Sequence, residues 1–284
     1  MVVFFVVLAS RCEVGGMGSR FLVVSQIDAT VGSPHQRELE EFSASKFPLF
    51  RDFGLERVRG VVCGELGGRF EGLGLGEDWS FTLEFFPEVN VHVLYFYYGD
   101  EFGDVEGELK FLFSGERAYW VPGEDLVTFT GIALNFLEAK LVGREPADRS
   151  YGEKSGLMVK ILEERREPFR LLRAEDAEGL GRFVGAEVLR NGSEWRIKRE
   201  VFPQVFVEVL YSRDMLDVSY SGRNLPSVGS YQLELLATFL INHIIRFITV
   251  ENHGKVKLPS ICYKMFSRMF TKEKGWSHHT SDAT

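Results

Sequence analysis

Apolar and polar positions alternate with a period of two in two separate stretches of the chain, and a long apolar segment follows each stretch. The alternating valines are Val89, Val91 and Val93 in the first stretch and Val205, Val207 and Val209 in the second. Such alternation predicts strands with one buried face. The long apolar segments at 122–141 and 231–250 predict helices.

The two stretches are copies of one unit. Residues 79–95 read WSFTLEFFPEVNVHVLY and residues 195–211 read WRIKREVFPQVFVEVLY, at a constant offset of 116 residues with nine identities in seventeen columns. Composition alone gives about one identity. Shorter matches flank them, G-R-F-x-G at 68–72 and 181–185 and L-x-T-F at 126–129 and 236–239. We interpret this as an ancient internal duplication.

Each copy predicts several antiparallel strands and one helix that covers their apolar face. The fold class is therefore α+β, with two tandem pseudo-symmetric repeats, each an antiparallel sheet of three or four strands covered by one long helix. Pro87 and Pro203 follow a Phe and precede a valine strand, so we expect both at a strand start or bulge. We expect the halves to meet across a pseudo-two-fold axis.

The repeats divide the chain into five segments. These are an N-terminal strand and short helix (1–57), repeat 1 (58–142), a polar linker (143–156), repeat 2 (157–250) and a basic amphipathic tail (251–284).

Neither of two long apolar runs in the sequence predicts a membrane span. The run at 2–8 is far shorter than the about 20 residues that a span needs. We interpret it as a buried strand or as residues upstream of a later start at Met17. The run at 231–250 contains four polar or charged residues, Glu234, Asn242, His243 and Arg246. Because these are costly in lipid, we predict a core helix and a cytoplasmic protein.

Charge and cysteine content exclude several classes of protein. The net charge of −8 argues against general nucleic-acid binding. Three widely spaced cysteines exclude a disulfide framework and a four-cysteine metal site. Only four Gln and six Asn occur, with abundant Glu, a bias typical of thermophiles.

An acidic segment at 100–108 carries the densest candidate chemistry, with five carboxylates in nine residues beyond a valine strand. Asp100, Glu101 and Asp104 are the candidate ligands of a divalent metal ion, bracketed by Gly99 and Gly103. The alternative is a solvated hairpin whose charges blunt a sheet edge.

Several short motifs around this segment carry a family resemblance. They are G-G at 67–68, G-x-D-x-S at 76–80, F-P-x-V at 86–89, G-D-E-F at 99–102 and L-F at 112–113. Together they resemble an uncharacterised domain family of anaerobic bacteria and archaea, with the pattern GG…GD-x-S…FP-x-V…GDEEFP…LF before a helix. The resemblance is best over residues 60–140 and weaker over 180–250. It implies no catalytic residues, because none are established in that family.

The C-terminal tail is basic and amphipathic. Lys264, Arg268 and Lys272 share one stripe if the segment is helical. Such a helix can dock on an acidic protein partner or a membrane surface. The alternative is a last helix packed on the body, with its basic stripe facing the acidic remainder.

The sequence thus predicts an uncharacterised cytoplasmic binding or accessory protein. The alternative is a metal-assisted enzyme that uses the acidic loop at 100–108. His92, on the strand face opposite the valines, is expected to face solvent, and His243 is expected in the core.

Overall fold

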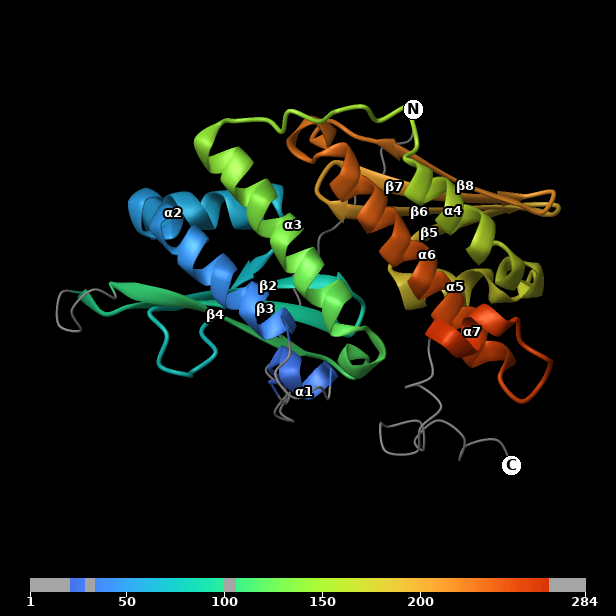
Figure 1. Cartoon of the computed structure of the whole chain (residues 1–284), viewed down its shortest axis with the longest axis horizontal. Helices are drawn as coiled ribbons and strands as arrows, with labels where there is room; N and C mark the ends of the chain where they lie inside the picture. Colours follow the sequence, from blue (N-terminus) through green and yellow to red (C-terminus); the bar gives the residue numbers. More distant parts are fainter. Residues whose placement is uncertain (1–20, 29–33, 100–105, 266–284) are drawn as a thin grey trace, which may run out of the picture.

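Two four-stranded antiparallel sheets, each covered by one long helix, form the body of the protein (Figure 1). The computed structural model describes residues 21–28, 34–99 and 106–265. The predicted α+β class and its two similar units are confirmed. The helices α3 and α6 lie next to each other at the centre, and the two sheets extend from the centre toward opposite sides of the molecule.

The first unit follows the order of the sequence. Its elements are α1 (Val24–Asp28), α2 (Pro34–Glu65), β1 (Arg69–Phe70), β2 (Trp79–Phe86), β3 (Val89–Tyr97), β4 (Gly107–Ser114), the 3-10 turn η2 (Ala118–Trp120) and α3 (Gly123–Val142). The strand order is β1-β2-β3-β4, with every neighbour antiparallel.

The second unit repeats that order with shorter helices before the sheet. Its elements are α4 (Gly156–Arg165), η3 (Glu167–Leu171), α5 (Asp176–Val184), β5 (Glu187–Asn191), β6 (Glu194–Phe202), β7 (Val205–Ser212), β8 (Met215–Ser221), η4 (Leu225–Ser227) and α6 (Ser230–Asn252). The strand order is β5-β6-β7-β8. A short helix, α7 (Ser260–Met265), follows.

The alternating valines form the buried faces of both sheets, because successive side chains of a strand point to opposite sides. Val91 and Val207 are fully buried at equivalent positions. The pairing register is also shared, since Trp79 lies opposite Tyr95 and Trp195 opposite Tyr211. Strands β2 and β6 each contain a bulge just before their last residue. It lies between Glu84 and Phe86 in β2 and between Glu200 and Phe202 in β6.

Pro87 and Pro203 lie in the tight turns that follow these bulges, outside the strands. Proline has no N–H to donate to a ladder, so this is where it is tolerated. Both prolines are thus outside the ladder, as predicted, although they lie in the turn between two strands and not at a strand start or bulge.

The short helix predicted after Pro34 is in fact the 32-residue α2. Leu39, Phe47 and Phe50 are buried on its first part, which packs on α3 and β4. Gly54 interrupts it with φ 70° and ψ 166°, and the chain resumes the helix in a new direction. Helix α2 is longer than predicted because it is buried against the first sheet. The local sequence pattern contains no information about that contact.

The short sequence match between 68–72 and 181–185 does not join equivalent positions of the two units. Arg69 and Phe70 form strand β1, whereas residues 181–183 lie within α5. The segments in equivalent positions are instead the C-terminal ends of α2 and α5, which are followed by Gly67 and Gly185. The match between 126–129 and 236–239 stands, because both segments lie on the long covering helices α3 and α6.

The two long helices start within one residue of the predicted segments 122–141 and 231–250. α3 begins at Gly123 with Pro122 as its N-cap, and α6 begins at Ser230 with Gly229 as its N-cap. By length and composition α6 passes as a candidate membrane span, but 83% of its apolar window is buried inside the protein. It is the core helix of the second unit.

Candidate functional site

The two units touch through reciprocal contacts that mark a pseudo-two-fold axis. Gly67, at the end of α2, lies against Pro203 of the second unit, so that an added Cβ would be 3.4 Å from the proline ring. Gly185, at the end of α5, lies against Pro87 of the first unit, where an added Cβ would be 3.1 Å away. Both glycines have positive φ, 69° and 65°, which other L-residues rarely adopt. Each unit therefore places its glycine against the proline of the other unit, and the two contacts are counterparts of each other.

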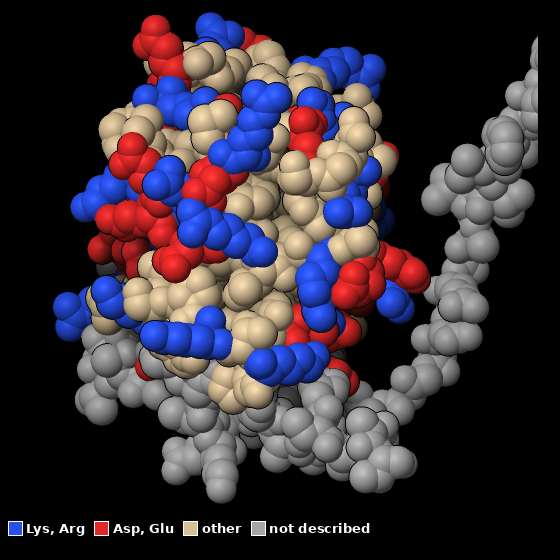
Figure 2. Space-filling view, turned by 90° about the vertical axis from the view of Figure 1, so that its right-hand side faces the viewer, with Lys and Arg blue, Asp and Glu red and all other residues tan. Residues whose placement is uncertain are grey.

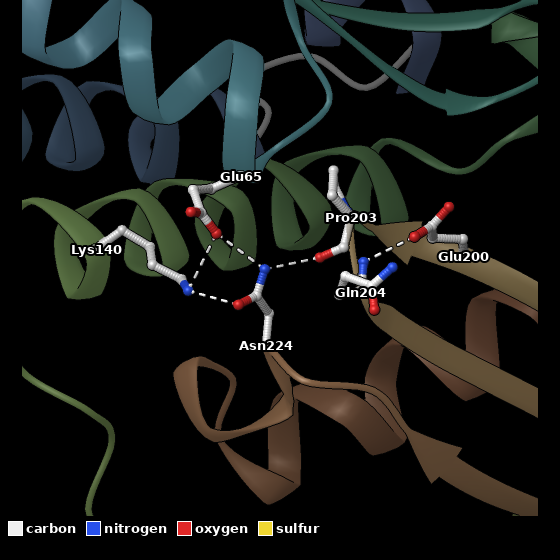
Figure 3. A network of polar contacts seen from close by, with 6 residues as sticks. All are labelled: Glu65, Lys140, Glu200, Pro203, Gln204 and Asn224. Carbon is white, nitrogen blue, oxygen red and sulfur yellow. Dashed lines mark hydrogen bonds and ion pairs between the residues drawn. The ribbon is translucent and has the colours of Figure 1, made fainter.

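A polar network centred on Asn224 joins the units on one side of this axis (Figure 3). Its side-chain nitrogen donates to Glu65 Oε2 and to the Pro203 carbonyl, both at 2.9 Å. Its side-chain oxygen accepts from Lys140 Nζ at 2.9 Å, and Lys140 lies 3.2 Å from Glu65. Glu65 and Lys140 belong to the first unit, so Asn224 connects α2 and α3 with the second sheet.

Arg117 holds the corresponding position on the other side of the axis. Its backbone N–H donates to the Glu88 carbonyl, as that of Asn224 donates to Gln204. Its guanidinium donates to the Phe183 carbonyl at 3.2 Å and lies 4.1 Å from the Phe183 ring centre. The two copies have thus kept the same cross-unit contact with different side chains.

Aromatic rings fill the junction between these two polar contacts. Five ring pairs cross between the units within the described residues. They are Phe85 with Phe239, Phe129 with Phe202, Phe136 with Phe202, Phe86 with His243 and Trp120 with Phe183, at centroid distances of 5.5, 6.0, 5.0, 3.9 and 6.2 Å. Such a buried aromatic contact holds the units as one body.

A half-open pocket of about 230 Å³ lies at the junction, next to the pseudo-two-fold axis. Its lining contains three equivalent pairs, Gly67 with Gly185, Leu83 with Arg199, and Glu84 with Glu200. We call it the axis cavity. Glu84 and Glu200 are exposed, whereas Leu83 and Arg199 are buried. The lining is not symmetric, because Leu83 corresponds to Arg199 and because Leu66, Phe129, Val201, Phe202 and Pro203 have no counterpart in it. Arg199 is its one buried cation.

Arg199 is held in an enclosed position with incomplete hydrogen bonding. It is 6% exposed, donates from Nη2 to the Phe85 carbonyl of the other unit, and lies 4.1 Å from the Phe86 ring centre. Its Nε and Nη1 have no hydrogen-bond partner in the described part of the chain. Burial lowers the pKa of Arg199 to about 10, and the charge of Glu84 opposes that shift. The group therefore stays cationic at neutral pH.

A second buried charge group lies where α3 and α6 meet. Arg246 approaches Asp125 Oδ2 at 3.5 Å and His243 Nδ1 at 3.4 Å. Burial raises the pKa of Asp125, and Arg246 opposes that rise. Burial, reinforced by the charge of Arg246, lowers the pKa of His243 well below its ordinary value. His243 is fully buried, as expected, and these groups form a structural ion pair beneath the junction.

The prediction that His92 faces solvent is wrong. It is 4% exposed, with Nδ1 2.6 Å from Thr82 Oγ1 and Nε2 2.7 Å from Ser114 Oγ. The ring of Phe21 meets it edge-on at 5.1 Å. Burial lowers the pKa of His92 to about 4, so the ring is neutral. The outer face of the first sheet is therefore covered around His92, while Lys110 on the same face is exposed. Alternation along one strand does not reveal such local cover.

The candidate metal ligands Asp100, Glu101 and Asp104 lie outside the described residues. Next to them, Tyr98 donates to Glu108, and Arg51 pairs with Glu106. Two of the five carboxylates are thus engaged within the protein. Across residues 21–28, 34–99 and 106–265, no group of three or more His, Cys, Asp or Glu side chains has a geometry that would hold a metal ion.

Of the predicted partner-binding residues, only Lys264 is described, and Arg268 and Lys272 lie beyond the described residues. Lys264 is exposed in the last turn of α7, while Cys262 of that helix is fully buried. The face shown in Figure 2 carries Lys and Arg interspersed with Asp and Glu. Docking of the tail on an acidic partner or membrane remains a prediction.

Sequence reasoning did not single out Arg199 or Asn224. The repeat alignment did contain a signal for the first, because Arg199 stands where the other copy has Leu83. No comparable signal marks Asn224, whose counterpart Arg117 lies outside the aligned columns.

No protein-family model matches the chain, and neither a curated protein nor a solved structure shows significant similarity to it. The site is therefore assessed from its own chemistry.

Proposed function

We propose that this is a cytoplasmic binding or accessory protein that holds a small polar molecule in the axis cavity. The observation that carries the proposal is Arg199, a buried cation that lines the cavity and has two nitrogens without a hydrogen-bond partner among the described residues. Leaving a buried donor unsatisfied costs about 1–3 kcal/mol, and more for a charged group. These nitrogens have almost no accessible surface in this structure, so a ligand with an acceptor recovers that cost only if the Arg199 side chain turns toward the cavity.

The position of the cavity supports the same function. Ligand sites commonly form where two structural units meet, since both units then contribute side chains. Here one unit supplies Glu84 and Leu83 and the other supplies Arg199 and Glu200. The rigid aromatic contact around the cavity keeps these groups in place without a ligand, which reduces the entropy lost on binding.

A thermal-shift screen of small metabolites on wild type and on Arg199→Met tests the proposal. A ligand at 100 times its Kd stabilises the native state by about 2.7 kcal/mol and raises the melting temperature. We expect compounds that stabilise wild type and fail to stabilise the variant. Arg196→Met is the matched control, because Arg196 is half-exposed on the same strand and pairs with Glu194. A screen without any Arg199-dependent compound would contradict the proposal.

The alternative, a metal-assisted enzyme at 100–108, rests on the density of carboxylates in that segment. It is tested separately by metal titration, as described in the Discussion.

A further inference from the structure

The edges of the first sheet are closed within the protein. An edge strand carries backbone N–H and C=O groups that have no neighbouring strand, and these groups can pair with another chain. On β4, Leu22 forms hydrogen bonds with both backbone groups of Phe113. Further along the same strand, the Ser43 hydroxyl accepts the Leu109 N–H. The other edge strand, β1, is only two residues long, so this sheet offers little backbone to a second chain.

The two edges of the second sheet differ from each other. On β8, the Val218 N–H donates to the carboxylate of its neighbour Asp217 at 2.8 Å, and helix α4 packs on this strand. A side chain that occupies an edge donor protects the edge from pairing. Strand β5 has no such protection among the described residues.

Two residues of β5 turn their backbone groups away from the sheet. The two-residue turn at 192–193 joins Asn191 to Glu194, which makes these two residues a hydrogen-bonded pair. Hydrogen bonding to β6 then alternates along β5, so the backbone groups of Val188 and Arg190 point outward. In the described part of the chain, neither residue has a backbone hydrogen bond on that side.

This edge is open to solvent. Leu189, between the two outward-facing residues, is 56% exposed. A shallow, open hollow lies beside the strand and is lined in part by Ala177, Gly181, Ala186 and Val188. Because the residues of α5 that line the hollow include the small Ala177 and Gly181, the helix leaves the edge accessible. Only the Ala186 N–H is already engaged, since it donates to the Gly181 carbonyl at 3.0 Å.

Two copies of β5 can pair with each other in one favourable register. Only residues that point outward exchange hydrogen bonds, so a two-fold axis passes through Val188, Leu189 or Arg190. An axis through Val188 needs the Ala186 N–H, which α5 already holds. An axis through Arg190 places two guanidinium groups directly opposite each other, which is destabilising. An axis through Leu189 pairs Val188 with Arg190 of the second copy twice, and all the free groups of both residues are used.

The side chains of that register are compatible. Leu189 meets Leu189 of the second copy in a non-hydrogen-bonded pair, where Cα atoms lie about 4.5 Å apart and side chains touch. Glu187 lies opposite Asn191 of the second copy, so a carboxylate meets an amide donor. No like charges are directly opposite between residues 187 and 191.

We propose that two copies of this chain associate through their β5 strands, antiparallel and centred on Leu189. The second sheets of both copies, four strands each, then form one continuous sheet. The partner is an identical copy because the strand is complementary to itself, as a two-fold interface requires. Five residues from each strand make a small contact, so the dimer is weak and depends on concentration. This inference does not rest on the proposed function.

Analytical ultracentrifugation of the full-length protein tests the association. Samples between about 10 µM and about 1 mM suit an interface of this size. We expect the mass to rise with concentration from 32.3 kDa toward twice that value. Leu189→Lys should raise the dimer Kd at least about tenfold, because it places like charges opposite each other at the axis. Met215→Lys is the matched control, since Met215 is an exposed apolar residue on the other edge strand, and its Kd should be unchanged.

Cysteine cross-linking tests the register. In a background with Cys12→Ser and Cys63→Ser, Leu189→Cys should form a disulfide-linked dimer under mild oxidation, because the paired Cα atoms lie within the about 4.4–6.8 Å that a disulfide spans. Glu187→Cys is the control. Its two copies lie four residues apart along the paired strands, about 13 Å, and should not cross-link.

Three results would overturn the proposal. The first is a mass of one chain at every concentration. The second is a dimer that Leu189→Lys and Met215→Lys weaken equally, because the contact would then lie elsewhere. The third is cross-linking of Glu187→Cys in place of Leu189→Cys, which would exclude the register centred on Leu189.

Discussion

His92 gives a sharp prediction for the pH dependence of stability. The ring is buried between Thr82, Ser114 and Phe21, and its pKa falls from 6.5 to about 4 because burial disfavours the charged form. The folded state therefore resists protonation of this ring, whereas the unfolded chain takes up a proton near pH 6.5. We replace the ring with His92→Gln, which keeps a polar side chain and does not titrate.

The sign and size of the effect follow from linkage. The folded pKa lies below the unfolded value, so the contribution of the neutral ring is complete above pH 6.5 and is lost as the pH falls toward 4. A difference of about 2.5 units at about 1.4 kcal/mol each amounts to about 3 kcal/mol. Below about pH 4 the folded protein also protonates, and the loss stops.

Urea unfolding at several pH values between 7.5 and 4, followed by tryptophan fluorescence, measures this loss. We expect the free energy of unfolding of wild type to fall about 3 kcal/mol further than that of His92→Gln over this range. The contribution of His243 is common to both proteins and cancels in the comparison. His253→Gln, at an exposed histidine, should behave like wild type. Parallel pH curves for wild type and His92→Gln would refute the reasoning.

Three further predictions concern the junction and the acidic loop. In denaturant unfolding, Gly185→Ala should lower the free energy of unfolding more than Gly143→Ala does. Both glycines have positive φ, which costs alanine about 1–2 kcal/mol, but only at position 185 does the added Cβ press against Pro87. Equal losses would contradict this. Asn224→Ala should cost about 1–3 kcal/mol in the same assay, because Glu65 and Lys140 lose a shared partner; no loss would mean that water replaces the network. Calorimetric titration with Mg²⁺, Mn²⁺ and Ca²⁺ should give heat with wild type and less with Asp100→Asn if the loop holds metal, and equal or absent heat would leave it a solvated turn.

The two units are alike in fold and different in chemistry. His92 and Thr82 of the first sheet stand where the second has Glu208 and Lys198, and only the first pair is buried. Leu83 likewise corresponds to Arg199. Each change places a polar group in a buried position of one copy alone, which is what specialisation of a once symmetric pair would produce.

The secondary structure followed from the sequence where it depends on neighbouring residues. The valine strands and the covering helices α3 and α6 appeared where the periodicity indicated them, and the prolines appeared in turns. The length of α2 was missed, because a helix of that kind is stabilised by the sheet on which Phe47 and Phe50 pack. The only sequence signal for the axis cavity was that Arg199 stands in the second repeat where the first repeat has Leu83.

By itself, the sequence determined the repeated unit, because a strand or helix face is defined by the spacing of side chains along one segment. Tertiary structure alone decided which residues meet. Gly67 meets Pro203 and Gly185 meets Pro87, each across more than 90 residues of sequence, and Arg199 lines the same pocket as Glu84 of the other unit. Burial and electrostatic environment depend on the surface packed against a side chain. That surface comes from distant parts of the chain, so only the assembled fold determines it.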